Sequence, residues 1–345
     1  MSKKKILFLT GSENQTTQMH AIAKQLPDYD CFFSQSFGDT VDVIFWTKMG
    51  WLEDTILSGH FKSEAEAYIE KNGLEYDYWA KKHKYDLVIH CTDMVVPHKL
   101  RKTKSIWVQE GMTDPVTPWA RFTKKLGLPG YFAMNTSMNG TSNLVDIYCC
   151  ASEGYKQHFV KLGAEADRFF PTGIPNYDNA QAYCENNFPH KDYVLVVTSD
   201  NREMLNEDDR EEFIAHATKI ANGRQMIFKL HPNEDFDRAI PEIQQLAPEG
   251  TLIYTTGNAH EMVANCAEYV GQYSTLVYTA LSLGKPVSAY FDTETLKAQT
   301  PIQNGGDSAR RIADIVREYI EYNGTVKQFL AQYKPNFLDN KKVAS

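Results

Sequence analysis

Two segments, far apart in the sequence, carry side chains that can hold an anion. In QMIFKLHPNED an apolar run with Lys229 near its end stops at His231 and Pro232, which would put the imidazole at the carboxyl end of a strand. In EYVGQYSTLVYTALSLGKPV, Ser274 and Thr275 follow a second apolar run and open a helical pattern. Helix N-termini bind phosphate, and a nearby histidine can donate to its oxygens and stabilise the charge of a leaving group. The two segments together predict a phosphate site, with a buried core histidine as the alternative for His231.

Two carboxylates that directly follow apolar runs are candidates for catalysis. Glu110, next to Gly111 in SIWVQEGMTDP, could act as a general acid or base. Asp200, at the end of YVLVVTSD, could act on a sugar carbon as a nucleophile or stabilise a cationic transition state. Each has a structural alternative, since Glu110 or Asp114 could cap a loop or helix and Asp200 could be a helix N-cap.

Small or polar residues at two strand ends could contact the rest of the ligand. Ser12 lies in TGSENQTTQMH, where small residues would let a ligand approach the start of the following helix. This segment is not GxGxxG, so dinucleotide binding is not supported and a tight turn is the alternative. Asn201 and Arg202, which follow Asp200 directly, and Gly111 are further candidates to contact the ligand.

The elements that would position these residues form a βα pattern that starts twice. Short apolar runs alternate with helical patterns, which is typical of doubly wound parallel sheets. We expect an α/β protein with a Rossmann-like domain over 1–178, a second over 190–315, and helices and a tail over 316–345 that pack back toward the first. Within the first domain, VDVIFW at 41–46 is predicted to be a strand and 63–83 a helix. The segment beginning FFPTGIPN, rich in Pro, Asn and Asp, is predicted to be the linker.

Composition limits the partners. A formal net charge of −8 gives no general attraction to nucleic acid. The six cysteines form no CxxC pair and suit a reducing cytosol, and we find neither a signal peptide nor a run long enough to span a membrane. We expect a cytoplasmic protein whose membrane association, if any, is peripheral and at the inner face. TPWARFTKKLG at 117–127 mixes bulky apolar and basic residues as interfacial helices do, and a solvated helix with one buried face is the alternative.

KLHPNED and STLVYTALSLGKPV resemble the C-terminal domain of the non-hydrolysing UDP-N-acetylglucosamine 2-epimerases and related GT-B glycosyltransferases. VTSDNRE occupies the place of the epimerases' Thr-x-His-Arg-x-Glu-Asn, and WVQEGMTDP that of Val-Glu-Ala-Gly-Leu-Arg. The chain departs from that pattern where Tyr278, Thr279 and Ala280 replace a Gln-Glu-Glu whose glutamate holds the ribose. Asn201 also replaces the histidine of the His-Arg pair.

A second resemblance, to bacterial GT-B sialyltransferases and Kdo transferases that use CMP-activated sugars, covers more of the motifs. Those enzymes share an acidic-Gly, a His-Pro and a Ser-Ser or Ser-Thr motif in that order, which Glu110-Gly111, His231-Pro232 and Ser274-Thr275 match. The chain is also similar, more loosely, to retaining β-Kdo transferases, in which an aspartate at the place of Asp200 is the nucleophile.

These resemblances imply a GT-B fold of two Rossmann-like domains facing each other across a cleft. They imply a glycosyltransferase that moves a sugar, Kdo or a related 2-keto acid, from CMP onto a bacterial surface saccharide or lipid-linked saccharide. A UDP-N-acetylglucosamine 2-epimerase-like UDP-sugar enzyme is the alternative. The substrate would be the nucleotide sugar itself, with no further cofactor and no metal.

Overall fold

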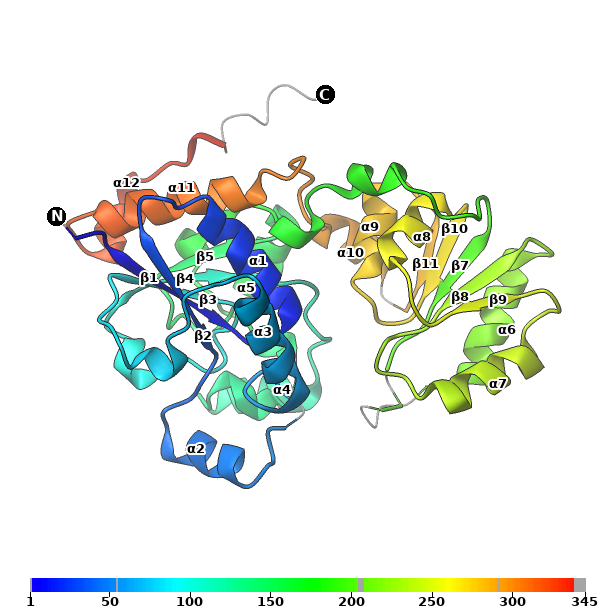
Figure 1. The fold of residues 1–345 in the computed structure, drawn as a ribbon, viewed down its shortest axis with the longest axis horizontal. Helices are drawn as coiled ribbons and strands as arrows, with labels where there is room; N and C mark the ends of the chain where they lie inside the picture. The colour runs from blue at the N-terminus through cyan, green and yellow to red at the C-terminus, as the bar shows by residue number, and fades with distance from the viewer. Residues whose placement is uncertain (1, 54, 201, 204–207, 291, 338–345) are drawn as a thin grey trace. The chain divides into compact units, whose positions relative to one another are not determined.

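The computed structural model describes residues 2–53, 55–200, 202–203, 208–290 and 292–337. The chain divides into two compact units, of which the first comprises Met1–Asp178 with Gly306–Ser345 and the second Asn179–Gly305. Each unit is built around one parallel sheet with helices packed against it (Figure 1). The prediction of α/β architecture is confirmed.

The sheet of the first unit has the strand order β2-β1-β3-β4-β5-β6. Its strands run almost entirely through apolar sequence, because in a parallel sheet both faces are covered by helices. Strand β2 is added on one side of β1, and β3 and the later strands are added on its other side, so the strand order reverses between β1 and β3. The strands are β1 (Lys5–Thr10), β2 (Asp30–Gln35), β3 (Leu87–His90), β4 (Lys104–Val108), β5 (Ile147–Cys150) and β6 (Phe169–Pro171).

Both terminal helices belong to the first unit. Ile312, Val316 and Tyr319 of α11 are buried in the same core as Ile6 and Phe8 of β1. The apolar face of α11 is therefore buried within this unit. The segment 306–315, which was expected in the second domain, belongs to the first unit. The helices of this unit are α1 (Glu13–Lys24), α2 (Val41–Lys48), α3 (Gly59–Lys71), α4 (Pro118–Lys125), α5 (Glu153–Lys161), α11 (Ser308–Glu321) and α12 (Val326–Gln332).

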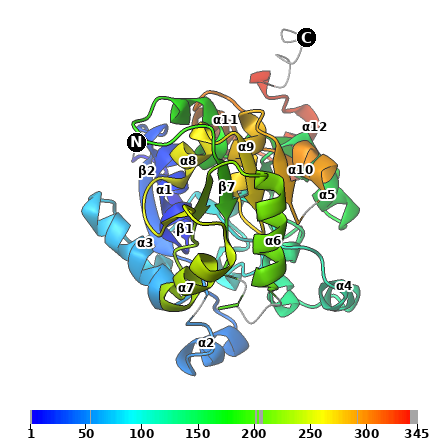
Figure 2. The same cartoon turned by 90° about the vertical axis from the view of Figure 1, so that its right-hand side faces the viewer.

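The second unit has a sheet of order β11-β10-β7-β8-β9 (Figure 1), whose strand β7 is labelled in Figure 2. Its first strand, β7, is central, with β8 and β9 added on one side and β10 and β11 on the other. The strands are β7 (Val194–Val197), β8 (Met226–Lys229), β9 (Leu252–Tyr254), β10 (Glu268–Gly271) and β11 (Val287–Ala289). The helices are α6 (Arg210–Ala221), α7 (Phe236–Leu246), α8 (Ala259–Asn265), α9 (Leu276–Ser282) and α10 (Thr293–Gln299).

Short 3-10 helices connect these elements. They are η1 (Tyr78–Ala80), η2 (His98–Leu100), η3 (Gly130–Ala133), η4 (Thr136–Met138), η5 (Ala166–Arg168), η6 (Pro175–Tyr177) and η7 (Ala180–Cys184).

Three expectations for the first unit were wrong. The segment 41–46 is not a strand but most of α2, and the strand beside β1 is instead β2. The helix expected over 63–83 ends at Lys71, because Asn72 and the left-handed Gly73 stop it. Phe169–Pro171, expected to be linker, is buried and pairs with β5 as β6.

Candidate functional site

Three neighbouring strands of the second unit end at the same level. Val197 of β7 is paired in register with Gly271 of β10 and with Lys229 of β8. The residues that follow these strands therefore share one edge of the sheet, and the ends of β8 and β10 lie about 10 Å apart, two strand spacings. This edge includes the switch point between β7 and β10, where open α/β sheets bind ligands.

Predicted site residues follow all three strands at this edge. Asp200 follows β7, His231 and Pro232 follow β8, and Ser274 and Thr275 follow β10. Hydrogen bonds join the three strand ends: the Ser199 N–H and Oγ donate to Gln272 Oε1 at 3.3 and 3.1 Å, and the His231 N–H donates to Thr198 Oγ1 at 3.1 Å. The edge is thus one hydrogen-bonded surface.

A buried ion cluster, which we define as Arg210, Asp208 and Glu234, is hydrogen-bonded to the residues of this edge. Arg210 Nη2 lies 2.7 Å from Glu234 Oε1 and 3.1 Å from Asp208 Oδ2, and all three side chains are at most 1% exposed. Glu234 Oε2 accepts the backbone N–H of His231 at 2.9 Å, and Asp208 accepts from the amide of Gln272. The cluster therefore fixes the turns after both β8 and β10.

His231 is held in one tautomer by its own turn. The backbone N–H of Asn233 donates to His231 Nδ1 at 3.3 Å, which leaves the ring hydrogen of neutral His231 on Nε2. Asp200 Oδ2 lies 3.6 Å from Nδ1 and accepts from Asn233 Nδ2 at 3.1 Å. The arrangement can donate from Nε2 to an anionic ligand.

Ser274 and Thr275 form the start of α9. Ser274 Oγ accepts the backbone N–H of Leu276 at 3.4 Å, and Thr275 is the N-cap residue. The positions that the epimerases fill with Gln-Glu-Glu hold Tyr278, Thr279 and Ala280, all of them buried.

The two cations predicted to contact the ligand, Lys229 and Arg202, bind protein groups in this structure. Lys229 is buried, its Nζ donates to the carbonyls of Leu230 at 2.6 Å and Thr255 at 3.2 Å, and burial lowers its pKa. Arg202 forms a bidentate pair with Glu242 at 3.0 to 3.2 Å. Both side chains are therefore engaged in packing the unit, and their roles toward a ligand stay predictions. Asn201 lies outside the described residues.

The remaining predicted residues lie in the first unit, at the carboxyl ends of β1 and β4. Glu110 accepts from Asn14 Nδ2 at 2.9 Å and from Gln15 Nε2 at 2.5 Å, so each carboxylate oxygen has an amide donor. Ser12 is the N-cap of α1, where its Oγ accepts the Gln15 N–H at 3.2 Å. The carbonyl of Gly111 accepts from the side chain of the preceding Gln109. Ser12 and Gly111 thus have structural roles that account for their positions, and their roles toward a sugar stay predictions.

The ion cluster could not be identified from the sequence. Asp208 and Arg210 belong to an acidic run that predicts a charged helix start, and Asp209 does cap α6. No local signal distinguishes Asp208, whose side chain is buried, from the exposed Asp209, because Asp208 is buried with Arg210, which pairs with the distant Glu234.

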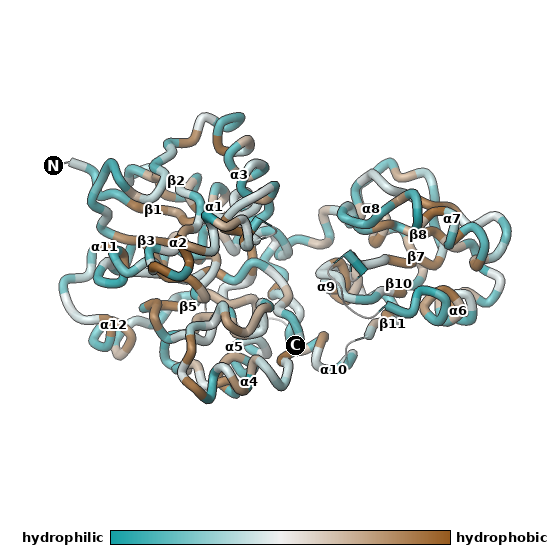
Figure 3. The backbone as a smooth tube through the Cα atoms, turned by 90° about the horizontal axis from the view of Figure 1, so that it is seen from below, coloured by the Kyte–Doolittle hydropathy of each residue, from teal (hydrophilic) through white to brown (hydrophobic). Residues whose placement is uncertain are grey.

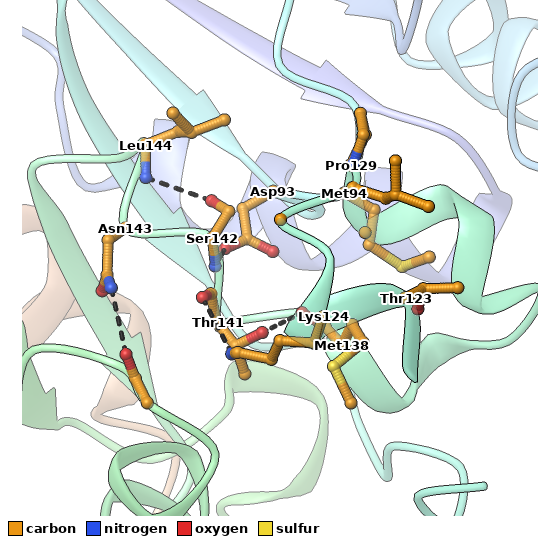
Figure 4. A pocket seen from close by; sticks show the side chains of 14 residues that line it. Asp93, Met94, Thr123, Lys124, Pro129, Met138, Thr141, Ser142, Asn143 and Leu144 are labelled. Atoms are coloured by element: carbon orange, nitrogen blue, oxygen red, sulfur yellow. Dashed lines mark hydrogen bonds between the residues drawn. The ribbon is translucent and has the colours of Figure 1, made fainter. Parts of the chain in front are cut away.

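A pocket of about 410 Å³ lies elsewhere in the first unit and involves none of the predicted residues (Figure 4). Lys124 of α4 and Asp93 are among the residues that line it. Asp93 is buried and accepts the N–H groups of Gly140 at 2.6 Å and Ser142 at 2.8 Å. Burial raises the Asp93 pKa despite these donors. Since its oxygens bind the loop that surrounds the pocket, Asp93 serves to fold that loop.

Within the part of the chain that the structure describes, no three His, Cys, Asp or Glu side chains gather as metal ligands would. Over the same residues, none of the helices combines the length and the apolar character needed to cross a membrane.

No protein-family model and no curated protein sequence matches the chain. Its fold is similar to that of a putative UDP-N-acetylglucosamine 2-epimerase from Listeria monocytogenes, at a TM-score of 0.56 and 14% identity over 94% of this chain and 98% of that one. The UDP-GlcNAc 2-epimerase from Neisseria meningitidis, bound to UDP-GlcNAc, has a TM-score of 0.54 and 12% identity over 91% of this chain and 99% of that one. The UDP-GlcNAc 2-epimerase of Methanocaldococcus jannaschii, in complex with UDP-GlcNAc and UDP, has a TM-score of 0.51 and 16% identity over 92% of this chain and 99% of that one.

At such low identity the likeness shows the fold. The chain is an α/β protein of the GT-B type, with two Rossmann-like units.

Proposed function

We propose that the protein is a nucleotide-sugar enzyme that acts on a UDP-activated sugar, with its phosphates bound at the β10-β7-β8 edge of the second unit. The observation that carries this is the register that puts Asp200, His231 and Ser274 on one edge at the switch point. The names of the similar structures, UDP-N-acetylglucosamine 2-epimerases, support UDP over CMP as the nucleotide.

The chemistry follows from the tautomer of His231. Its Nε2–H would donate to a phosphate oxygen, and backbone N–H groups after β10 would contact the same group. Negative charge grows on the phosphate as the sugar–oxygen bond breaks, and these donors would stabilise it. Asp200, beside His231, would stabilise positive charge on the sugar or attack it. We propose that no metal or further cofactor takes part.

A second candidate is transfer of Kdo or a related sugar from CMP to a saccharide or lipid-linked saccharide. The ordered motifs Glu110-Gly111, His231-Pro232 and Ser274-Thr275 favour it. The absence of carboxylates at Tyr278, Thr279 and Ala280 counts against the epimerase chemistry itself, so the two candidates must be separated by substrate.

The test incubates the purified chain with UDP-N-acetylglucosamine alone, and separately with CMP-Kdo and a saccharide acceptor. We expect NMR to detect the manno epimer or free UDP in the first reaction. Selective release of CMP in the second would replace the UDP assignment with the transferase. Turnover in neither reaction would contradict both.

The site is tested by Asp200→Asn and His231→Asn. Each should lower turnover by about 100-fold or more, since each removes a group that acts on developing charge. His216→Asn is the matched control, because His216 lies on α6 of the same unit and bonds only to Ser288 among the contacts described. Full activity in both site variants would exclude this edge as the active site.

A further inference from the structure

Helix α4 presents its apolar side to solvent. Trp119, Phe122 and Leu126 follow one another at helical spacing and are 51%, 50% and 57% exposed. The side that packs on the protein carries the small residues Ala120 and Thr123. A helix in a water-soluble domain ordinarily buries its largest apolar side chains, so this orientation is reversed.

Helix α2 has the same reversed orientation. Val41, Phe45 and Met49, at spacings of four residues, are exposed, and Val43 is the buried residue of the helix. In Figure 3, which views the molecule from below, α2 is brown over much of its length. Exposed apolar surface of this kind marks an interaction site.

The helix η3 joins α2 and α4 into one surface. The ring of Trp46 on α2 lies 5.8 Å from that of Phe132, and the indole N–H of Trp119 donates to the Phe132 carbonyl at 2.8 Å. Tyr131 Oη also donates to Asp42 on α2 at 2.6 Å. We call the exposed side chains of the two helices the apolar face: Val41, Phe45, Met49, Trp119, Phe122 and Leu126.

Helix α4 and the segment that follows it are positively charged, although the chain carries −8 overall. Residues 115–145 include three basic residues and no Asp or Glu. Arg121 and Lys125 are exposed on α4, one turn apart and next to the apolar stripe, and Lys48 is exposed at the end of α2. On α2 the charge of Lys48 is offset by Asp42, which accepts a hydrogen bond from Tyr131, so the positive charge beside the apolar face lies on α4.

We propose that the apolar face docks on a membrane surface that contains anionic phospholipid, with α2 and α4 lying in the interface. Trp and Phe side chains favour the boundary between headgroups and acyl chains, and basic residues beside them attract anionic lipid. A second copy of the chain fits less well, because a two-fold interface would bring Arg121 and Lys125 of one copy toward those of the other. The inference is independent of the proposed function.

The test is cosedimentation of the full chain with vesicles of phosphatidylcholine, either pure or mixed with phosphatidylglycerol. We expect binding to the mixed vesicles that weakens with added salt, and little binding to pure phosphatidylcholine. The variant Trp119→Ala/Phe122→Ala and the variant Arg121→Glu/Lys125→Glu should each bind at least about tenfold more weakly.

The control for charge is Lys71→Glu/Lys219→Glu, which changes the net charge equally at exposed positions on two other helices, α3 and α6, and should leave binding unchanged. Equal binding of wild type and both face variants would overturn the proposal, as would no binding to mixed vesicles. A concentration-dependent dimer that the alanine variant abolishes, without vesicle binding, would show instead that a second copy covers the face. Because no sugar nucleotide is present, none of these outcomes depends on the enzymatic proposal.

Discussion

The buried ion cluster makes a sharp prediction about the stability of the second unit. Arg210→Met keeps much of the volume of the side chain and removes its charge. Glu234, whose side chain is fully buried, would then lose its arginine partner, and Asp208 would keep only Arg202, whose Nε lies 3.5 Å from Asp208 Oδ2. Breaking a buried ion pair by removing one partner costs about 3–5 kcal/mol, because an uncompensated charge stays in the interior. We expect Arg210→Met to destabilise the second unit by at least this amount.

The matched control is Arg310→Met on α11. Arg310 also pairs with two carboxylates, those of Asp307 and Asp314, but its side chain is 52% exposed. Exposed ion pairs contribute about 0–1 kcal/mol. A third variant, Glu234→Gln, leaves Arg210 paired with Asp208 and should fall between the two.

The assay is urea unfolding of the full chain, followed by two signals. The tryptophans all belong to the first unit, so their fluorescence follows that unit, whereas far-ultraviolet circular dichroism follows both. With m-values of about 1–3 kcal/mol per molar urea, Arg210→Met should lower the dichroism midpoint by about 1 M or more. A midpoint equal to that of Arg310→Met would refute the claim that burial makes this cluster important.

Two further predictions concern pH and packing. Burial lowers the pKa of His260, which stacks on Tyr183, to about 4, whereas the unfolded chain would protonate it near 6.5. Neutral His260 therefore destabilises nothing above pH 6.5, but the unfolding free energy falls by up to about 3 kcal/mol as the pH falls from 6.5 to 4. The variant His260→Gln should flatten this decline, and an unchanged slope would contradict the prediction. An added Cβ at Gly11 would overlap Ile56, so Gly11→Ala should lower the stability of the first unit by about 1–3 kcal/mol in thermal melts, and an unchanged melting temperature would contradict the close approach.

Much of the secondary structure could be predicted because it depends on local pattern. The apolar runs that become β1, β3, β7 and β8 stand out since parallel strands are buried on both faces. The segment 41–46 was wrongly predicted to be a strand because its apolar residues lie on the exposed side of a helix. Local composition does not reveal which side of an element faces the core.

The candidate site divides along the same line. The sequence by itself determined that His231, Asp200, Ser274 and Thr275 each follow a strand, because an apolar run that stops at polar residues marks a strand end. Only the tertiary structure decided that β7 lies between β8 and β10, which puts those residues on one edge. It also decided that Lys229 and Arg202 bind protein groups and that Asp208, Arg210 and Glu234 are buried together. Strand order and the burial of charge depend on contacts between distant segments, and no local pattern of residues encodes them.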